Sequence, residues 1–196
     1  MNIDLVHDIQ GVYRKVLNAM ARPGCIENVK NEEEKVDLNI RSYKNTVLVM
    51  LMLLDAEVSF NVVSDNSIDV ISTISQITYA KIKPIEEADY VFVLSDSIDK
   101  LKEAYEKVKE GTLIDPNLSA TIIAEVLKIS DEKELELSGP GIKEKNYIKI
   151  SGNYGWVKAR ENKNKEYPLG VDSIFLDSDG QVICIPRTTK INILEE

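Results

Sequence analysis

Five consecutive apolar residues, from Tyr90 to Leu94, constrain the fold of this chain more than any other feature. A strand without polar positions belongs in a sheet that is covered on both faces, as in α/β proteins. An amphipathic helix pattern follows it, between Ser97, the predicted N-cap, and Gly111, which stands just beyond the helix end. This alternation of strand and helix predicts βαβ units in layered α/β packing.

The other elements follow from periodicity and turn residues, and together they predict one α/β domain over residues 1–196. A helix is expected from Leu5/Val6 to Met20, with Asn2 or Asp4 at its start and Arg22-Pro23-Gly24 at its end. The rest of the first half is expected to hold a strand within 25–30, an acidic loop at 31–35, a helix over 42–54 capped by Ser42, a strand over 57–63 and a helix over 65–77.

The second half is predicted to be rich in strands. Its expected elements are a hairpin of 121–129 with 134–138, a turn at 139–141, a strand at 147–150, an exposed charged stretch at 158–166, a hairpin of 171–176 with 182–185, and a strand at 191–194. The only tryptophan, Trp156, follows a glycine-containing loop, and packing is a commoner use of such a residue than stacking on a base.

The composition excludes several kinds of chemistry. His7 is the only histidine, which rules out a multi-histidine metal site. Cys25 and Cys184 form no CxxC pair, so neither a zinc ribbon nor a disulfide framework is expected. The formal net charge of −9 argues against nucleic-acid and anionic-membrane partners. The apolar run 47–54 is too short to span a bilayer and no signal-peptide pattern is seen, so we expect a soluble, cytoplasmic protein.

Two loops have residues that are compatible with either ligand binding or a plain turn. Asp177-Ser178-Asp179-Gly180 resembles the opening of a calcium loop, but the later ligands are missing and a hairpin turn is favoured. The glycines of Ser138-Gly139-Pro140-Gly141 suit a phosphate nest, but Pro140 lacks an N–H donor, which favours a tight turn. No metal ligand and no catalytic residue is assigned from these patterns.

Arg187 is the residue that most suggests ligand binding. It stands in Pro186-Arg187-Thr188-Thr189, which interrupts an apolar β pattern in a chain with few arginines. A guanidinium offers a planar fork for a carboxylate or a phosphate. If the flanking strands form the expected hairpin, Asp172 comes close to Arg187. A buried ion pair that holds the hairpin and a ligand pocket are equally compatible with this pattern.

Four segments together resemble one known family. In chain order they are Tyr13-Arg14-Lys15-Val16-Leu17-Asn18-Ala19-Met20-Ala21-Arg22-Pro23-Gly24, Leu137-Ser138-Gly139-Pro140-Gly141-Ile142, Tyr167-Pro168-Leu169-Gly170-Val171-Asp172 and Ile185-Pro186-Arg187-Thr188-Thr189. They are similar to the signatures of the PhnH subunit of the carbon–phosphorus lyase complex, with which bacteria degrade phosphonates. Their positions near both ends and the centre extend the resemblance over nearly the full length.

The resemblance implies a three-layer αβα sandwich with a mixed sheet, akin to a pyridoxal-phosphate-dependent transferase fold without the cofactor. It implies homodimers that join PhnG, PhnI and PhnJ subunits. That assembly, with ATP as substrate, attaches a phosphonate to C1 of ribose while displacing adenine, and so forms ribose 1-methylphosphonate 5-triphosphate. This chain would be an accessory subunit. The alternatives are a transferase with its own Asp172/Arg187 pocket and a stand-alone nucleotide- or phosphonate-binding module.

The candidate ligand-binding residues are the motif positions Arg14, Met20, Pro23, Gly24, Gly139, Gly141, Pro168, Gly170, Asp172, Pro186, Arg187, Thr188 and Thr189. An acidic protein holds ATP or a phosphonate only where a local cationic pocket is built. Arg187 with Arg14 is the candidate source of that charge, and Thr188, Thr189 and the turn at 139–141 could add contacts. The family has no Schiff-base lysine to carry over, and His7 is expected to be dispensable.

Overall fold

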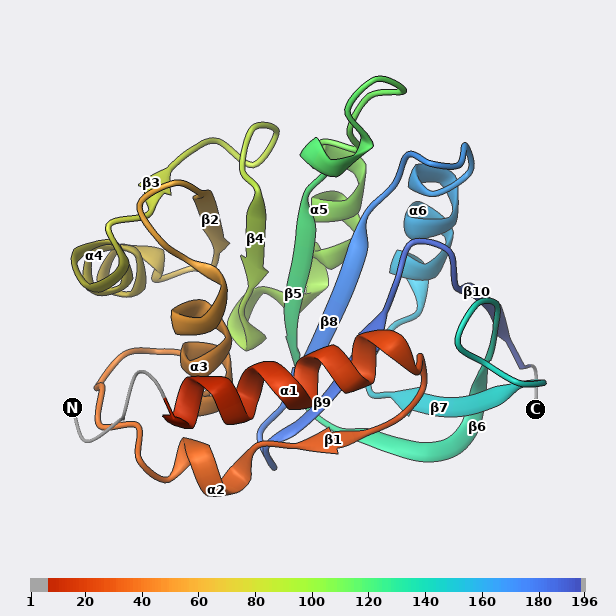
Figure 1. Ribbon diagram of the computed structural model, residues 1–196, viewed down its shortest axis with the longest axis horizontal. Coiled ribbons are helices and arrows are strands. Elements are labelled where there is room, and N and C mark those ends of the chain that lie inside the picture. Colours follow the sequence, from red (N-terminus) through yellow and green to blue (C-terminus); the bar gives the residue numbers. More distant parts are fainter. Residues whose placement is uncertain (1–6, 195–196) are drawn as a thin grey trace.

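A seven-stranded mixed sheet forms the centre of the computed structural model, which describes residues 7–194 (Figure 1). Its strand order is β1-β9-β8-β5-β4-β2-β3, and a separate three-stranded sheet has the order β10-β6-β7. The strands of the large sheet are β1 (Glu27–Asn28), β2 (Ser59–Val63), β3 (Lys81–Ile82), β4 (Tyr90–Val93), β5 (Thr121–Val126), β8 (Asp172–Asp177) and β9 (Gln181–Ile185). Those of the small sheet are β6 (Ile129–Ser138), β7 (Asn146–Ile150) and β10 (Lys190–Ile193).

The apolar strand β4 lies inside the parallel part of the sheet. It pairs in parallel with β2 and with β5, and β5 pairs in parallel with β8. Phe92 and Leu94 are buried on one face of the sheet, and Val91 and Val93 are buried on the other. Coverage on both faces explains why this strand has no polar position. The prediction from residues 90–94 is therefore confirmed.

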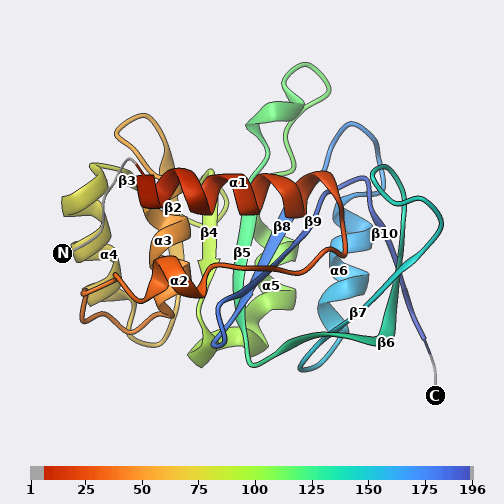
Figure 2. The same cartoon turned by 60° about the horizontal axis from the view of Figure 1, so that its bottom comes forward.

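Helices cover both faces of the large sheet, as Figure 2 shows from below. One face packs against α1 (His7–Ala21), α3 (Lys44–Leu53) and α4 (Ser67–Thr78), with the short α2 (Lys30–Glu33) nearby. The other face packs against α5 (Leu101–Lys107), α6 (Gly155–Lys163) and the three-stranded sheet. The expected α/β fold with a mixed sheet is confirmed, and the small sheet is an addition to the layer that holds α5 and α6.

Trp156 of α6 anchors that second layer. Its side chain is buried, stacks on Tyr105 with ring centroids 5.9 Å apart and lies 4.9 Å from the ring of Phe175 in β8. Aromatic contacts of this kind add to the stabilisation from buried area. The packing interpretation of Trp156 is confirmed, and α6 is held against the sheet.

Most predicted elements match the structure, but the hairpin expected between 121–129 and 134–138 is wrong. β5 stays in the large sheet, whereas β6 runs without a reversal through 130–133 and belongs to the small sheet. The pairing of β6 with β7 shifts register between Ser130 and Leu135. A β-bulge leaves extra residues unpaired, so the polar residues there mark an irregular stretch of strand and not a turn.

Two predicted N-caps are also wrong. The helix α3 begins after Tyr43, and the Ser42 hydroxyl donates to the Glu125 carboxylate at 2.7 Å instead. Ser97 lies inside the 3-10 helix η1 (Ser95–Lys100), which precedes α5. The acidic segment 31–35, predicted to be a loop, overlaps α2 (Lys30–Glu33). The expected helix start, with Asn2, Asp4, Leu5 and Val6, lies outside the described residues.

The charged stretch 158–166, expected to be exposed, is largely α6 and carries a buried arginine. Arg160 is only 3% exposed, because it follows Trp156 by four residues and so lies on the inner side of the helix. Within residues 7–194, no helix is long and apolar enough to cross a membrane.

Candidate functional site

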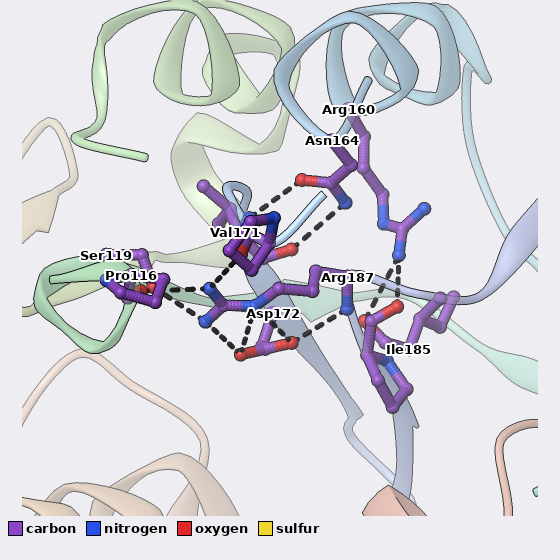
Figure 3. A network of polar contacts seen from close by, with 10 residues as sticks. Pro116, Ser119, Arg160, Asn164, Val171, Asp172, Ile185 and Arg187 are labelled. Atoms are coloured by element: carbon purple, nitrogen blue, oxygen red, sulfur yellow. Dashed lines mark hydrogen bonds and ion pairs between the residues drawn. The ribbon is translucent and has the colours of Figure 1, made fainter. Parts of the chain in front are cut away.

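Asp172 and Arg187 form an ion pair at the open end of the β8–β9 hairpin (Figure 3). The Arg187 Nη2 atom lies 2.7 Å from Oδ2 of Asp172, and Nε lies 3.2 Å from the same oxygen. The backbone N–H of Arg187 donates to Oδ1 of Asp172 at 2.7 Å. The approach of these two residues, predicted from the hairpin, is confirmed.

The remaining donors of Arg187 bind other segments of the chain. Nη1 donates to the carbonyl oxygens of Pro116 and Pro168, at 3.1 and 3.3 Å, and Nη2 donates to the Ser119 hydroxyl at 2.6 Å. A guanidinium has five N–H donors. These contacts and the ion pair occupy all three guanidinium nitrogens (Figure 3). The geometry favours a structural clamp over a free ligand-binding fork.

The four motif segments meet in space. A Cβ atom on Gly139 would lie 3.0 Å from the carbonyl oxygen of Thr188, so the central turn packs directly on the Pro186–Thr189 segment. A Cβ atom on Gly141 would lie 2.4 Å from the carbonyl oxygen of Ala21, at the end of α1. Both glycines have positive φ angles, 134° and 83°, which side chains disfavour. The motif glycines therefore allow close contact between segments far apart in sequence.

The other candidate residues divide into neighbours of this cluster and outliers. Pro23 accepts a hydrogen bond from Asn146 at 2.7 Å, which places Pro23-Gly24 against β7. The Gly170 N–H donates to the Glu110 carbonyl at 3.0 Å. Arg14 is exposed on α1, and Met20 packs into the core on the α1 side of the sheet. The structure thus does not bring Arg14 to Arg187 as a second cation.

A cavity of about 760 Å³ lies beside Arg187. It is bounded by α6, the segment that follows α6, Pro140 and the residues from Arg187 to Asn192. Its cationic side chains are Arg160, Lys165, Arg187 and Lys190. The one lining carboxylate, Glu161, forms an ion pair with Lys158 at 2.8 Å. A locally positive cavity therefore exists in a chain whose formal net charge is −9.

Arg160 is a buried residue of this cavity that the sequence did not reveal. Its Nη1 donates to the Thr189 carbonyl at 3.0 Å, and its Nη2 donates to the carbonyls of Ile185 and Pro186 (Figure 3). Burial lowers the pKa of Arg160 from its usual value, partly opposed by Tyr105 and Asp172. The Nε of Arg160 and the Oγ1 of Thr189 are buried and have no hydrogen-bond partner.

Glu125 is a second buried charged residue that the sequence did not reveal. At 1% exposure, its carboxylate accepts hydrogen bonds from the Ser42 hydroxyl, the Tyr43 N–H and the Ser95 N–H at 2.7, 2.7 and 3.0 Å. It lies behind a hollow of about 410 Å³ at the carboxyl ends of β2 and β4. These hydrogen bonds explain the buried carboxylate, which joins β5 to residues 42–43 and to Ser95.

No group of three or more His, Cys, Asp or Glu side chains in residues 7–194 is arranged to hold a metal ion. The predicted turn at Asp177–Gly180 is confirmed. Oδ1 of Asp177 accepts hydrogen bonds from the N–H groups of Asp179 and Gln181, each at 2.9 Å, and so closes the β8–β9 turn. This is the use of a turn aspartate that needs no cation.

The chain is similar to a known protein family and to a curated protein. The sequence model for "Bacterial phosphonate metabolism protein (PhnH)" matches residues 2–192, a range that contains all four motif segments. HtxG of Stutzerimonas stutzeri, which carries the provisional name of a C-P lyase subunit protein, is 39% identical over 103 residues. The alignment spans 52% of this chain and 51% of HtxG, so the chain matches about half the length of this curated relative.

Proposed function

Because the chain belongs to the PhnH family of bacterial phosphonate metabolism proteins, we propose that it is a subunit of a carbon–phosphorus lyase complex. The observation that carries the proposal is the family match over residues 2–192, supported by the likeness to HtxG, whose name refers to such a subunit. The contact of the four motif segments around Gly139, Gly141, Asp172 and Arg187 supports a shared architecture with the family.

The subunit acts by supporting its partners and not by a transfer reaction of its own. The geometry of Arg187 favours this role over the alternative, a transferase with an Asp172/Arg187 pocket. All three guanidinium nitrogens of Arg187 are bonded to protein acceptors, so binding a substrate there would first break the clamp. An enzyme of that kind would need a free cation at this point.

In full, the proposal is a homodimer that joins PhnG, PhnI and PhnJ subunits in the cytoplasm. The assembly forms ribose 1-methylphosphonate 5-triphosphate from ATP and methylphosphonate, with release of adenine. The fold of the subunit is related to that of the pyridoxal-phosphate-dependent transferases and works without the cofactor. The nucleotide and the phosphonate are substrates of the assembly.

The second candidate function is a stand-alone module that binds nucleotides or phosphonates. The cavity beside Arg187 favours it, because four cationic side chains line a space of about 760 Å³. Small-molecule sites commonly have volumes of roughly 300–1,000 Å³. The two functions differ in whether the chain needs partners.

Co-expression decides between them. The chain and the PhnG, PhnI and PhnJ homologues of the same organism are produced together, and the complex is recovered through a tag on PhnI. We expect the chain to co-elute with the other three in size-exclusion chromatography. Elution of the chain alone, while the other three assemble, would contradict the subunit role and favour the stand-alone module.

Adenine release gives an independent measurement. The assembly is mixed with ATP and methylphosphonate, with and without this chain, and the isolated chain serves as the third sample. We expect release only where the chain and its partners are both present. Adenine release by the isolated chain would instead support the transferase. In that case Arg187→Ala should abolish the release while the variant still folds.

A further inference from the structure

We infer that the cavity beside α6 is a binding site for a phosphorus oxyanion, with Arg160 and Thr189 as its inner contacts and Lys165 and Lys190 at its mouth. The ligand class is a phosphonate or phosphate group. This inference rests on the proposed function only for the choice between these two sources. The site itself is argued from the charges and hydrogen bonds of the cavity.

The first argument is an unbalanced buried charge. The network contains the guanidinium groups of Arg160 and Arg187 but one carboxylate, Asp172, and Arg187 is paired with it (Figure 3). Arg160 binds only carbonyl oxygens, although the residue is only 3% exposed. A buried charge without a counterion is costly. An anion in the adjoining cavity supplies that counterion.

The second argument is a pair of unused polar atoms. Nε of Arg160 and Oγ1 of Thr189 are both buried and lack hydrogen-bond partners. Native proteins leave few such atoms unpaired, and each one asks for an explanation. One atom carries an N–H and the other an O–H, so both can donate to the same anion. Solvent does not reach either atom, so binding requires a small shift of the cavity wall.

The third argument concerns the kind of anion. Exposed Lys165 and Lys190 line the same cavity, and within residues 7–194 neither forms an ion pair. A phosphate-type group carries a charge of about −1.5 to −2 at pH 7 and has three acceptor oxygens, so it can use several donors at once. Val157, Leu169 and Ile191 line the cavity as well and provide an apolar wall for an organic substituent.

The test is calorimetric titration of the full chain with methylphosphonate and, separately, with inorganic phosphate. Dimethyl methylphosphonate, which has the same central atom without the negative charge, is the ligand control. The decisive variant is Thr189→Val, which keeps the shape of the side chain and removes the hydroxyl. Because Oγ1 of Thr189 has no partner, a purely structural role predicts that this variant is neutral or more stable.

Thr46→Val is the matched control variant. Thr46 is on α3, which packs against the opposite face of the sheet, and its Oγ1 is also buried without a partner. We expect both variants to melt at or above the wild-type temperature. We expect Thr189→Val to weaken anion binding about tenfold or more, as for a hydrogen bond to a charged group, and Thr46→Val to leave it unchanged. Arg160→Met should abolish binding, and Thr189→Val still decides the matter if that variant does not fold.

The inference is overturned if neither anion binds at millimolar concentration, if Thr189→Val binds as wild type, or if the neutral ester binds as well as the anions. Tighter binding of methylphosphonate assigns a phosphonate to the site, and equal or tighter binding of phosphate assigns a phosphate group, as in a nucleotide. Co-elution of Thr189→Val with the partner subunits tests the proposed function separately. Loss of assembly with intact anion binding would overturn the subunit role alone.

Discussion

The guanidinium of Arg187 binds the carboxylate of Asp172 through both Nε and Nη2, and its other hydrogen bonds reach Pro116, Ser119 and Pro168. One side chain thus joins the β8–β9 hairpin to the segment before β5 and to the loop before β8. Arg160, the neighbouring arginine, has no carboxylate partner. Arg187 therefore holds the segments of the cavity wall together. Arg160 is the arginine that we infer to bind the anion.

Replacing Arg187 by lysine should destabilise the protein although it keeps the charge. A lysine cannot reproduce the planar fork, so acceptors at Pro116, Pro168 and Ser119 lose their donors. We expect Arg187→Lys to lower the free energy of unfolding by about 2–3 kcal/mol, measured by urea denaturation. Arg41→Lys at an exposed position is the control and should change it by less than about 0.5 kcal/mol. Equal stability of Arg187→Lys and wild type would contradict the clamp.

Alanine at Gly141 should cost more than alanine at Gly152. Both glycines have positive φ angles, 83° and 119°, so both variants carry backbone strain. The new methyl group at position 141 would lie 2.4 Å from the Ala21 carbonyl oxygen, whereas nothing lies within 4 Å at position 152. We expect Gly141→Ala to melt at a clearly lower temperature in thermal denaturation. Similar melting temperatures would show that α1 and the central turn do not pack closely.

The carboxylate of Asp89 should contribute to acid denaturation. Burial raises its pKa, but hydrogen bonds from Lys109 and Ser59 lower it more, so the folded-state pKa lies below the usual 3.8. A depressed folded-state pKa adds stability above the unfolded pKa, and that stability is lost as the pH falls through the folded value. We expect the unfolding free energy of Asp89→Asn to be lower at pH 7 and to fall less steeply from pH 5 to pH 3.

Urea denaturation at several pH values between 3 and 7 measures this effect. Asp37→Asn, at an exposed position, is the control and should keep the wild-type dependence on pH. A steeper fall in Asp89→Asn than in wild type would contradict the assigned sign.

The two cysteines should differ in reactivity. Cys184 is fully buried, its thiol donates to the Val16 carbonyl at 3.7 Å, and burial raises its pKa well above the usual range. The thiolate is the form of cysteine that attacks thiol reagents, so the native Cys184 should be inert. We expect Ellman's reagent to modify one thiol, Cys25, in the native protein and two in urea. Cys25→Ser is the control and should lose the reaction in the native protein. Rapid modification of both thiols in the native protein would contradict the burial of Cys184.

Local patterns predicted a large part of this structure. The apolar strand at Tyr90–Leu94 and the hairpin that contains Asp172 and Arg187 depend on residues near each other in sequence, so periodicity and turn chemistry were enough. The polar stretch in β6 has the composition of a hairpin turn, and only its pairing with β7 shows that it is an irregular stretch of strand. The proposal of Arg14 as a second cation is not supported, since that side chain is exposed on α1 and does not line the cavity.

The sequence by itself determined the alternation of strands and helices, the excess of negative charge, and the family to which the four motifs point. Only the tertiary structure decided what the arginines do. Whether a guanidinium is bonded to a carboxylate, as in Arg187, or buried against carbonyls beside a cavity, as in Arg160, depends on groups brought together from distant segments. The energy of a charge is set by its surroundings in space, and those surroundings exist only after the sheet and α6 have packed.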